Sequence, residues 1–294
     1  MEMNKYFAFK LIHKIAVTLP RKWSYWIGCR IAGVSYLLKK RLRQAVKANI
    51  THILSQTQSR KVTDVEISDK AEGVFKNFAK YLVDFFSFSK FDENNIHGLI
   101  NMNGVDHMRN AFNKGKGVIG LTAHLGNWEL CAVVTSLLGF DVNAVTMSHD
   151  NTKINRLFVN QRVAKGVKVI PVGSGAAAYI KILKQNQLIA MAGDRLINDS
   201  GIEIMFFNKR AIIPKGPLIL SMRTGAPIVM GFMVRTPEDK FNLTFEEKID
   251  PDEFPGDFSM KLQNMAKRVV GLMEKYISQY PSQWFLFYKV WEEK

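Results

Sequence analysis

A histidine that closely follows a short apolar run constrains this chain more than any other feature. The run at residues 117–121 has the length and composition of a buried strand, and His124 stands just beyond it, five residues before Glu129. On one continuous helix, residues five apart point about 140° away from each other, so these two meet only if the chain turns between them. Gly126 permits such a turn, and Asn127 is a favourable cap for a helix that follows. The stretch therefore predicts a strand, a tight turn and a helix, with His124 at the carboxyl end of the strand.

The chemistry of this stretch is that of a base acting on a hydroxyl. Histidine accepts protons near neutral pH, and an acidic neighbour fixes its tautomer and stabilises its charged form. Glu129 is one candidate for that neighbour. Asp194 is a second, because it follows an apolar run at 187–192 that predicts a strand ending at the same edge of a sheet. The alternatives are a structural core histidine, a glutamate that favours a helix start and a loop aspartate that caps a turn.

The order of apolar runs and amphipathic segments predicts an α/β fold. Residues 43–91 show helical spacing, with a polar link at 55–69 between two helices. Beyond them, strands separated by helices favour a mixed, mostly parallel central sheet flanked by helices. Strands are expected at 118–123, 141–147, 168–171, 187–192, 205–213, 226–234 and 242–246, and helices at 128–138, 152–164, 175–185, 217–223 and 259–279.

Positive charge is concentrated near the beginning of the chain. The net charge is +15, and residues 1–61 carry thirteen lysines and arginines against one acidic residue. Apolar side chains are interspersed with these cations, and the segment at 23–38 is rich in Trp and Tyr. This composition is typical of helices that lie in the headgroup region of a membrane. A single membrane span is the alternative, which the short run and the cost of burying Arg30 disfavour.

We therefore divide the chain into a basic amphipathic, membrane-associating arm at 1–41 and a single domain at 42–294. No repeat, low-complexity tract or flexible linker suggests a further division. Charge alone also allows a nucleic-acid partner, but the arm is aromatic and apolar and nucleic-acid-binding motifs are missing. No secretory signal stands out, and Cys29 and Cys131 form neither a disulfide framework nor a metal pattern, which favours a reducing compartment.

Several polar side chains stand where an anionic substrate group would be met. Arginine suits bidentate contact with phosphate or carboxylate, and a helix amino terminus also favours anions. A helix arginine more often faces solvent, which is the alternative. The other five histidines show no metal-ligand spacing, so we expect no metal site. The candidate substrate-binding residues are Asn127, Arg156, Arg162, Arg195, Lys209, Arg210 and Lys215.

Short motifs also follow one another in a recognisable order. They are 114–119 leading into 123–129, Gly193-Asp194-Arg195, Phe206-Phe207-Asn208, 223–227 and Pro281-Ser282-Gln283-Trp284. In this order they resemble the bacterial lipid A biosynthesis acyltransferases, the lauroyl and myristoyl late acyltransferases of the lysophospholipid acyltransferase superfamily. The resemblance covers residues 41–291, and the ordered set is much more specific than any single motif.

The resemblance implies a glycerol-3-phosphate-acyltransferase-like fold on the cytoplasmic face of the inner membrane, peripheral, monotopic or held by one amino-terminal span. It implies transfer of a fatty acyl chain from an acyl carrier protein or coenzyme A thioester to a glycolipid hydroxyl, first of all on a lipid A precursor. His124 would be the general base, Glu129 its partner or a substrate-orienting acid, and Asp194 a further acid of the site. Direct attack on the thioester needs no acyl-enzyme, metal or other cofactor. We expect the backbone N–H groups of Gly126 and Asn127 to hold the oxyanion.

The sequence departs from the family pattern at three places. Arg195 stands where Gln is frequent, Asn208 stands where Gly is frequent, and Tyr288-Lys289 replaces His-Arg. None of these changes touches His124 or Glu129, so they bear on the acceptor rather than on acyl transfer. Relatives with the same motif acylate phosphatidylinositol mannosides and other glycolipids. Another glycolipid or lysophospholipid acceptor is therefore one alternative, and a non-catalytic membrane-binding relative is another.

Overall fold

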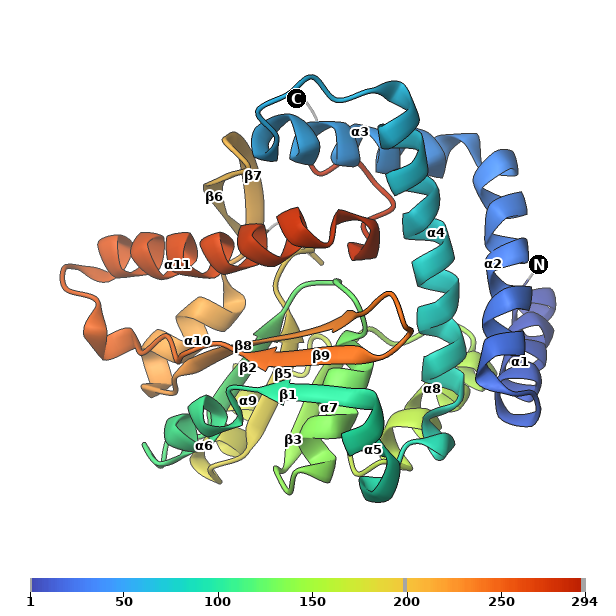
Figure 1. Cartoon of the computed structure of the whole chain (residues 1–294). Helices are drawn as coiled ribbons and strands as arrows, with labels where there is room; N and C mark the ends of the chain where they lie inside the picture. Colours follow the sequence, from blue (N-terminus) through green and yellow to red (C-terminus); the bar gives the residue numbers. More distant parts are fainter. Residues whose placement is uncertain (1, 198–199, 292–294) are drawn as a thin grey trace.

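The computed structural model describes residues 2–197 and 200–291, which form a central sheet with helices on both faces (Figure 1). Across these residues the sheet has seven strands, in the order β1-β9-β8-β2-β5-β3-β4. β8 and β9 pair antiparallel and the other neighbours pair in parallel, which confirms the predicted mixed, mostly parallel sheet. The strands are β1 (Ile100–Asn103), β2 (Val118–Thr122), β3 (Val142–Thr146), β4 (Lys168–Pro171), β5 (Leu188–Ala192), β8 (Ile228–Arg235) and β9 (Phe241–Phe245).

Each face of the sheet has its own helices. α6 (Val105–Phe112), α7 (Trp128–Leu137) and α8 (Thr152–Val163) share one core with the strands. α9 (Ala176–Lys184), α10 (Gly216–Thr224) and α11 (Phe258–Gln279) share the other. In Figure 1, α11 crosses above the sheet and α7 lies below it. Every residue of β8 is buried, as expected of a strand covered on both faces.

The strand expected at 205–213 is instead a hairpin. β6 (Gly201–Phe206) and β7 (Lys209–Pro214) pair antiparallel in a separate two-stranded sheet. Phe207 and Asn208 form its two-residue turn, with φ angles of 50° and 57°. Asparagine tolerates this left-handed region, but a bulky residue such as phenylalanine rarely adopts it. An aromatic first turn residue, in place of a typical turn residue, therefore concealed the boundary between the two strands.

Four long helices precede the sheet, namely α1 (Glu2–Thr18), α2 (Arg21–Leu38), α3 (Lys40–Thr57) and α4 (Asp64–Phe86). The polar link between α3 and α4 is shorter than expected, because α3 continues to Thr57 and Thr63 caps α4 by accepting a hydrogen bond from Glu66 N. α2 runs alongside α4 (Figure 1) and buries Tyr25, Ala32 and Tyr36. The short α5 (Glu93–Leu99), β1 and α6 were not expected from the sequence.

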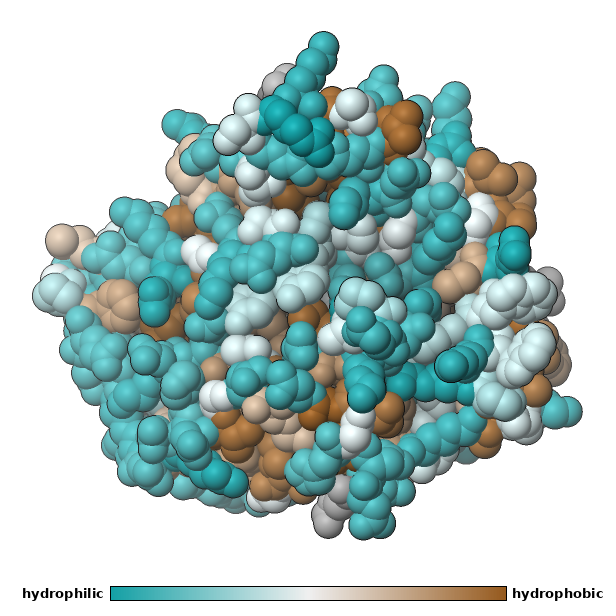
Figure 2. Space-filling view, viewed as in Figure 1, coloured by the Kyte–Doolittle hydropathy of each residue, from teal (hydrophilic) through white to brown (hydrophobic). Residues whose placement is uncertain are grey.

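The outer face of α1 and α2 is apolar and exposed. Figure 2 shows hydrophobic side chains along the right-hand margin, where α2 lies in Figure 1. Arg30 is exposed and its guanidinium lies 5.4 Å from the centre of the Trp26 ring. Within the part of the chain that the structure describes, no helix combines the length and apolarity needed to cross a bilayer. The exposed large apolar residues of the two helices are Phe7, Leu11, Val17, Trp23, Trp26, Ile31, Val34, Leu37 and Leu38.

The helix break at Lys39 lies close to the predicted end of the arm at residue 41. The division into an arm and a single domain stays a prediction.

Candidate active site

Two neighbouring strands bring His124 and Asp194 together. β2 and β5 pair in parallel with Thr122 opposite Ala192. Residues two places beyond these strand ends are therefore neighbours at the carboxyl edge of the sheet, where strands lie about 4.8 Å apart. His124 Nδ1 lies 2.7 Å from Asp194 Oδ1, and the backbone N–H of His124 donates to Oδ2 at 2.8 Å. Both residues stand at the carboxyl ends of their strands, as the sequence predicts.

The charge on Asp194 fixes the tautomer of His124. Burial raises the pKa of Asp194, but the charge of His124 and the hydrogen bonds from His124 and Trp284 outweigh burial and lower the pKa overall. The carboxylate only accepts hydrogen bonds, so Nδ1 of His124 carries a proton and Nε2 keeps its lone pair. The His124 side chain is 23% exposed, so the ring is only partly enclosed. An imidazole held in this way can take up a proton at Nε2.

A segment from near the end of the chain completes the site. Trp284 Nε1 donates to Asp194 Oδ2 at 2.9 Å, and Phe285 N donates to the carbonyl of His124 at 2.8 Å. Leu125 and Trp284 also form an antiparallel bridge. In the sequence, 281–284 stands out as a motif, but nothing local to it indicates a contact with Asp194.

Gly126 makes the turn that follows His124. Its φ is 63°, and a Cβ at this position would lie 2.0 Å from the carbonyl oxygen of Met233. This close approach lets Asn127 N donate to Met233 O at 2.7 Å. Asn127 Oδ1 accepts a hydrogen bond from Leu130 N, which confirms the predicted cap at the start of α7.

The same contacts correct the expected role of the Gly126 and Asn127 backbone. Gly126 N donates to Gln283 O at 2.8 Å, and Asn127 N donates to Met233 O, so neither N–H is free to hold an oxyanion. The side chain of Asn127 is buried as well, between the α7 cap and Asp84. Asn127 is therefore part of the framework of the site and does not face a substrate.

Glu129 is paired with Arg162 rather than with His124. Arg162 Nε and Nη2 donate to its two carboxylate oxygens at 2.7 and 2.6 Å, and each side chain is only 10% exposed. Burial lowers the pKa of Arg162, but the charge of Glu129 outweighs burial and raises the pKa overall. Two expectations are thus corrected: Asp194 takes the place next to the imidazole, and Arg162 joins α8 to α7 instead of facing solvent or a phosphate. A substrate-orienting role for Glu129 stays a prediction.

The remaining candidate cations lie at or near the surface. Arg156, Arg195 and Arg210 are exposed, and Lys209 and Lys215 are half-buried. Substrate contacts for these five residues stay predictions.

Arg195 lies within electrostatic range of a second group at the site, the phenol of Tyr288. Burial and the charge of Asp194 raise the pKa of Tyr288 to about 12, against the opposing charge of Arg195. The phenol therefore stays protonated beside the site.

An aromatic wall runs from His124 to an apolar cavity. Trp128 packs edge-on against His124 with ring centres 5.0 Å apart, and Tyr81 stacks on Trp128 at 4.4 Å. Tyr81 in turn stacks on Phe78, and Phe78 lines the cavity. Phe78 also packs against Phe285, whose N–H is bonded to His124 O.

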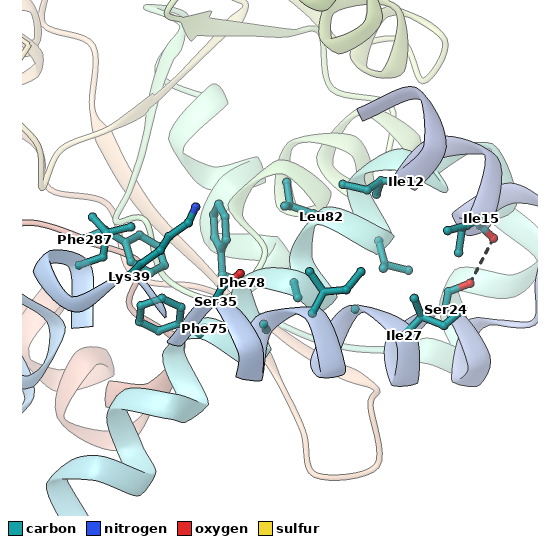
Figure 3. Close-up of a pocket in the computed structure, with 16 residues that line it drawn as sticks. Ile12, Ile15, Ser24, Ile27, Ser35, Lys39, Phe75, Phe78, Leu82 and Phe287 are labelled. Atoms are coloured by element: carbon teal, nitrogen blue, oxygen red, sulfur yellow. Dashed lines mark hydrogen bonds between the residues drawn. The ribbon is translucent and has the colours of Figure 1, made fainter. Parts of the chain in front are cut away.

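The cavity has a volume of about 370 Å³ and lies between α1, α2 and α4. Figure 3 shows Lys39, Phe75 and Phe287 at one end and Ile12 and Ser24 at the other. Lys39 is the charged residue of an otherwise apolar or small-residue lining. No group of three His, Cys, Asp or Glu side chains that could hold a metal occurs within residues 2–197 and 200–291.

Comparison with known proteins covers nearly the whole chain. Residues 2–293 match the family described as bacterial lipid A biosynthesis acyltransferase. The chain belongs to this family. Members of the lipid A biosynthesis acyltransferase family are acyltransferases, and the family implies an acyl thioester donor and a lipid acceptor.

Curated relatives of this lipid A biosynthesis acyltransferase family member are named phosphatidylinositol mannoside acyltransferases. The protein from Mycolicibacterium smegmatis is 23% identical over 269 residues, which cover 88% of this chain and 83% of the relative. Those from two strains of Mycobacterium tuberculosis are 24% identical over 130 residues, which cover 43% of this chain and 41% of each relative. By their names, these relatives transfer acyl groups to phosphatidylinositol mannosides.

Proposed function

We propose that this acyltransferase moves a fatty acyl chain from an acyl carrier protein or coenzyme A thioester to a hydroxyl of a membrane glycolipid, with His124 as general base. The observation that carries the proposal is the contact between His124 Nδ1 and the ionised carboxylate of Asp194. It leaves a basic Nε2 on a partly exposed ring at the carboxyl edge of the sheet.

The transfer proceeds by direct attack. Nε2 of His124 takes the proton of the acceptor hydroxyl while its oxygen bonds to the thioester carbonyl carbon. Asp194 stabilises the imidazolium that forms, as the acid of a catalytic triad does. The tetrahedral intermediate then collapses, the C–S bond breaks, and the imidazolium returns the proton to the leaving thiolate. The products are an ester and a free thiol, and the histidine is regenerated.

The cavity between α1, α2 and α4 suits the hydrocarbon part of a substrate. Its lining is nearly all apolar, and the aromatic wall of Trp128, Tyr81 and Phe78 connects it with His124. Burying an alkyl chain there would contribute about 0.8 kcal/mol for each buried CH₂ group. Lys39 at one end is placed to meet an anionic headgroup.

The arm supplies the membrane contact of the proposed enzyme. Exposed Trp23 and Trp26 and the apolar residues of the same face would enter the headgroup region of an anionic leaflet. Basic residues near such a surface contribute about 1 kcal/mol each. We place the enzyme peripherally on the cytoplasmic face of the inner membrane, where its thioester donors are made.

A lipid A precursor is our first choice of acceptor, from the matched family, and a phosphatidylinositol mannoside is the second, from the named relatives. A direct test incubates the purified enzyme with acyl thioester and each acceptor, or a lysophospholipid, and follows the lipids by mass spectrometry. The expected result is one added acyl mass on the lipid A precursor. If another lipid gains the mass, the chemistry stands and the acceptor is wrong.

The role of His124 is tested in the same assay. We expect His124→Ala to lower turnover by about 10²–10⁴-fold, the usual contribution of a general base. His97→Ala, at an exposed histidine of α5, is the matched control and should retain activity. Turnover of the His124→Ala enzyme at the rate of this control would refute the proposed base. Failure of the wild-type enzyme to consume any thioester would favour a non-catalytic, membrane-binding relative.

A further inference from the structure

A buried polar cluster joins α2, α4, β8 and the loop that carries His124. At its centre is Asp84, whose side chain is fully buried near the end of α4. Its Oδ1 accepts a hydrogen bond from the Tyr25 hydroxyl of α2, and its Oδ2 is bound by Arg235 at the end of β8. Oδ2 also accepts a hydrogen bond from Asn127 Nδ2 at 3.3 Å. One carboxylate therefore holds three elements that are distant in the sequence.

Tyr25 is fixed in this cluster as a donor. Burial raises the pKa of its phenol, and the charge of Asp84 raises it further, so the hydroxyl keeps its proton. Its oxygen accepts hydrogen bonds from Arg21 Nε at 2.5 Å and from Arg235 Nη1 at 2.8 Å. The hydroxyl thus has both its proton and its lone pairs engaged, which leaves it one orientation.

A second route connects Arg235 with the same loop. The backbone N–H of Arg235 donates to Gln283 Oε1 at 2.8 Å, and Gln283 Nε2 donates back to Arg235 O at 2.8 Å. The carbonyl of Gln283 then accepts the hydrogen bond from Gly126 N. The two residues after Leu125 are thus each tied to the cluster, one through Gln283 and one through Asp84.

Buried charges are costly, and a pair of them is weak support for stability by itself. Here each charged group is hydrogen-bonded, which makes the cluster rigid and gives it a defined geometry. Asn127 shows what this geometry does, because its Oδ1 caps α7 while its Nδ2 binds Asp84. The end of the turn that starts at His124 is therefore fixed from both sides.

We propose that Asp84 is a positioning residue for the His124 loop, and that Tyr25 acts through it to couple the docking of α2 to the placement of His124. α2 would then do more than hold the protein on a lipid surface, because its inner face completes the framework of the site. The effect on turnover rests on the proposed role of His124, whereas the effect on the loop does not.

The test uses variants of the whole chain that each change one side chain. Tyr25→Phe removes the hydroxyl from the cluster. Tyr36→Phe is the matched control, because Tyr36 is also buried on α2 and its hydroxyl bonds Ser68 O outside the cluster. Asn127→Ser breaks the contact with Asp84 from the other side while serine still caps α7. Hydrogen exchange of the Gly126 and Asn127 amides measures how often the His124 loop opens. Measurement of kcat and KM with detergent-dispersed acceptor gives the turnover in the absence of a membrane.

We expect faster exchange of the two loop amides in Tyr25→Phe and in Asn127→Ser, but not in Tyr36→Phe. We also expect kcat to fall by roughly 10- to 100-fold with KM within about twofold, since a 1 Å misplacement costs up to 10²-fold. The Tyr25→Phe/Asn127→Ser double variant should be no slower than the slower single variant, because both changes break one network.

Unchanged exchange of the loop amides in Tyr25→Phe, or effects on kcat that multiply in the double variant, would overturn the coupling. Faster exchange with unchanged kcat has a different meaning. It would support the positioning of the loop by Asp84 and refute the proposed catalytic role of His124.

Discussion

Replacing Asp194 by asparagine should leave the fold in place and invert the tautomer of His124. Oδ2 of Asp194 accepts two hydrogen bonds, from His124 N and Trp284 Nε1, whereas Oδ1 faces only His124 Nδ1. The amide oxygen of the introduced asparagine would therefore take the Oδ2 position and keep both donors. Its NH₂ group would then face Nδ1 and donate to it, which moves the imidazole proton to Nε2. His124, the proposed base, would lose the lone pair that takes the proton of the acceptor hydroxyl.

The expected losses of stability and of kcat in Asp194→Asn depend on which hydrogen bonds of Asp194 the asparagine keeps. The two hydrogen bonds to Oδ2 persist and the third becomes a bond between neutral groups, so the loss of stability should be at most about 1.5–3 kcal/mol, the value of one bond to a charged group. The loss of kcat should be about 10⁴-fold, as when the triad aspartate of a serine protease is replaced by asparagine. Thiol release gives kcat, thermal unfolding gives stability, and nitrogen NMR of the imidazole identifies the protonated nitrogen.

Asp141→Asn is the control, because Asp141 is an exposed carboxylate that pairs with Lys168 at 2.9 Å. This variant should match the wild type in all three measurements. An Asp194→Asn enzyme that keeps kcat within tenfold of the wild type, or a proton that stays on Nδ1, would refute the reasoning.

Three further predictions follow from the site and its surroundings. Glu129→Gln should destabilise the fold by about 3–5 kcal/mol, because it leaves the buried Arg162 without its charge partner; a fall in kcat at unchanged thermal stability would instead point to a direct role. Gly28→Phe should fill the cavity, since a Cβ at Gly28 has only ordinary contacts at 3.5 Å or more, and should slow long-chain donors at least about tenfold relative to short-chain donors. Val34→Phe, on the exposed face of the same helix, is the control and should keep the wild-type preference for donor chain length. An equal preference in Gly28→Phe and Val34→Phe would contradict the assignment of the cavity to the acyl chain. The lowered pKa of Asp194 contributes stability that is present above its unfolded pKa of 3.8 and is lost as the pH falls through the folded value. The midpoint temperature of thermal unfolding should therefore fall more steeply between about pH 5 and pH 3 in the wild type than in Asp194→Asn. Parallel curves for the two proteins would contradict an ionised Asp194 carboxylate.

The sequence predicted those features of the fold that depend on residues close together in the chain. The strand, turn and helix around His124 follow from an apolar run, a glycine and a capping asparagine, and all three are confirmed. The sequence also predicted that Asp194 lies at the same sheet edge as His124, because the carboxyl ends of parallel strands meet at one edge. The partner of His124 was predicted less well, since Glu129 was the first candidate and Asp194 only the second, and the structure places Asp194 beside the imidazole.

The contacts that the sequence did not reveal connect distant parts of the chain. Nothing near Glu129 indicates that Arg162 would occupy both of its oxygens. Nothing near Asp84 indicates a buried cluster, because the spacing of residues in the aromatic-rich last turn of α4 does not show which partners an aspartate will meet. The turn at Phe207 was missed for a different reason, since tertiary packing there overrides the local preference of phenylalanine.

The contact of Trp284 with Asp194 also bears on when the site forms during synthesis. The loop at His124 is made about 160 residues before Trp284, so at 5–20 residues per second roughly 8 to 30 s separate the two on the ribosome. In that interval the arm has emerged, but Gly126 N and Asp194 still lack their partners Gln283 and Trp284. The order of translation therefore delivers the helices of the arm first and completes the contacts around His124 last.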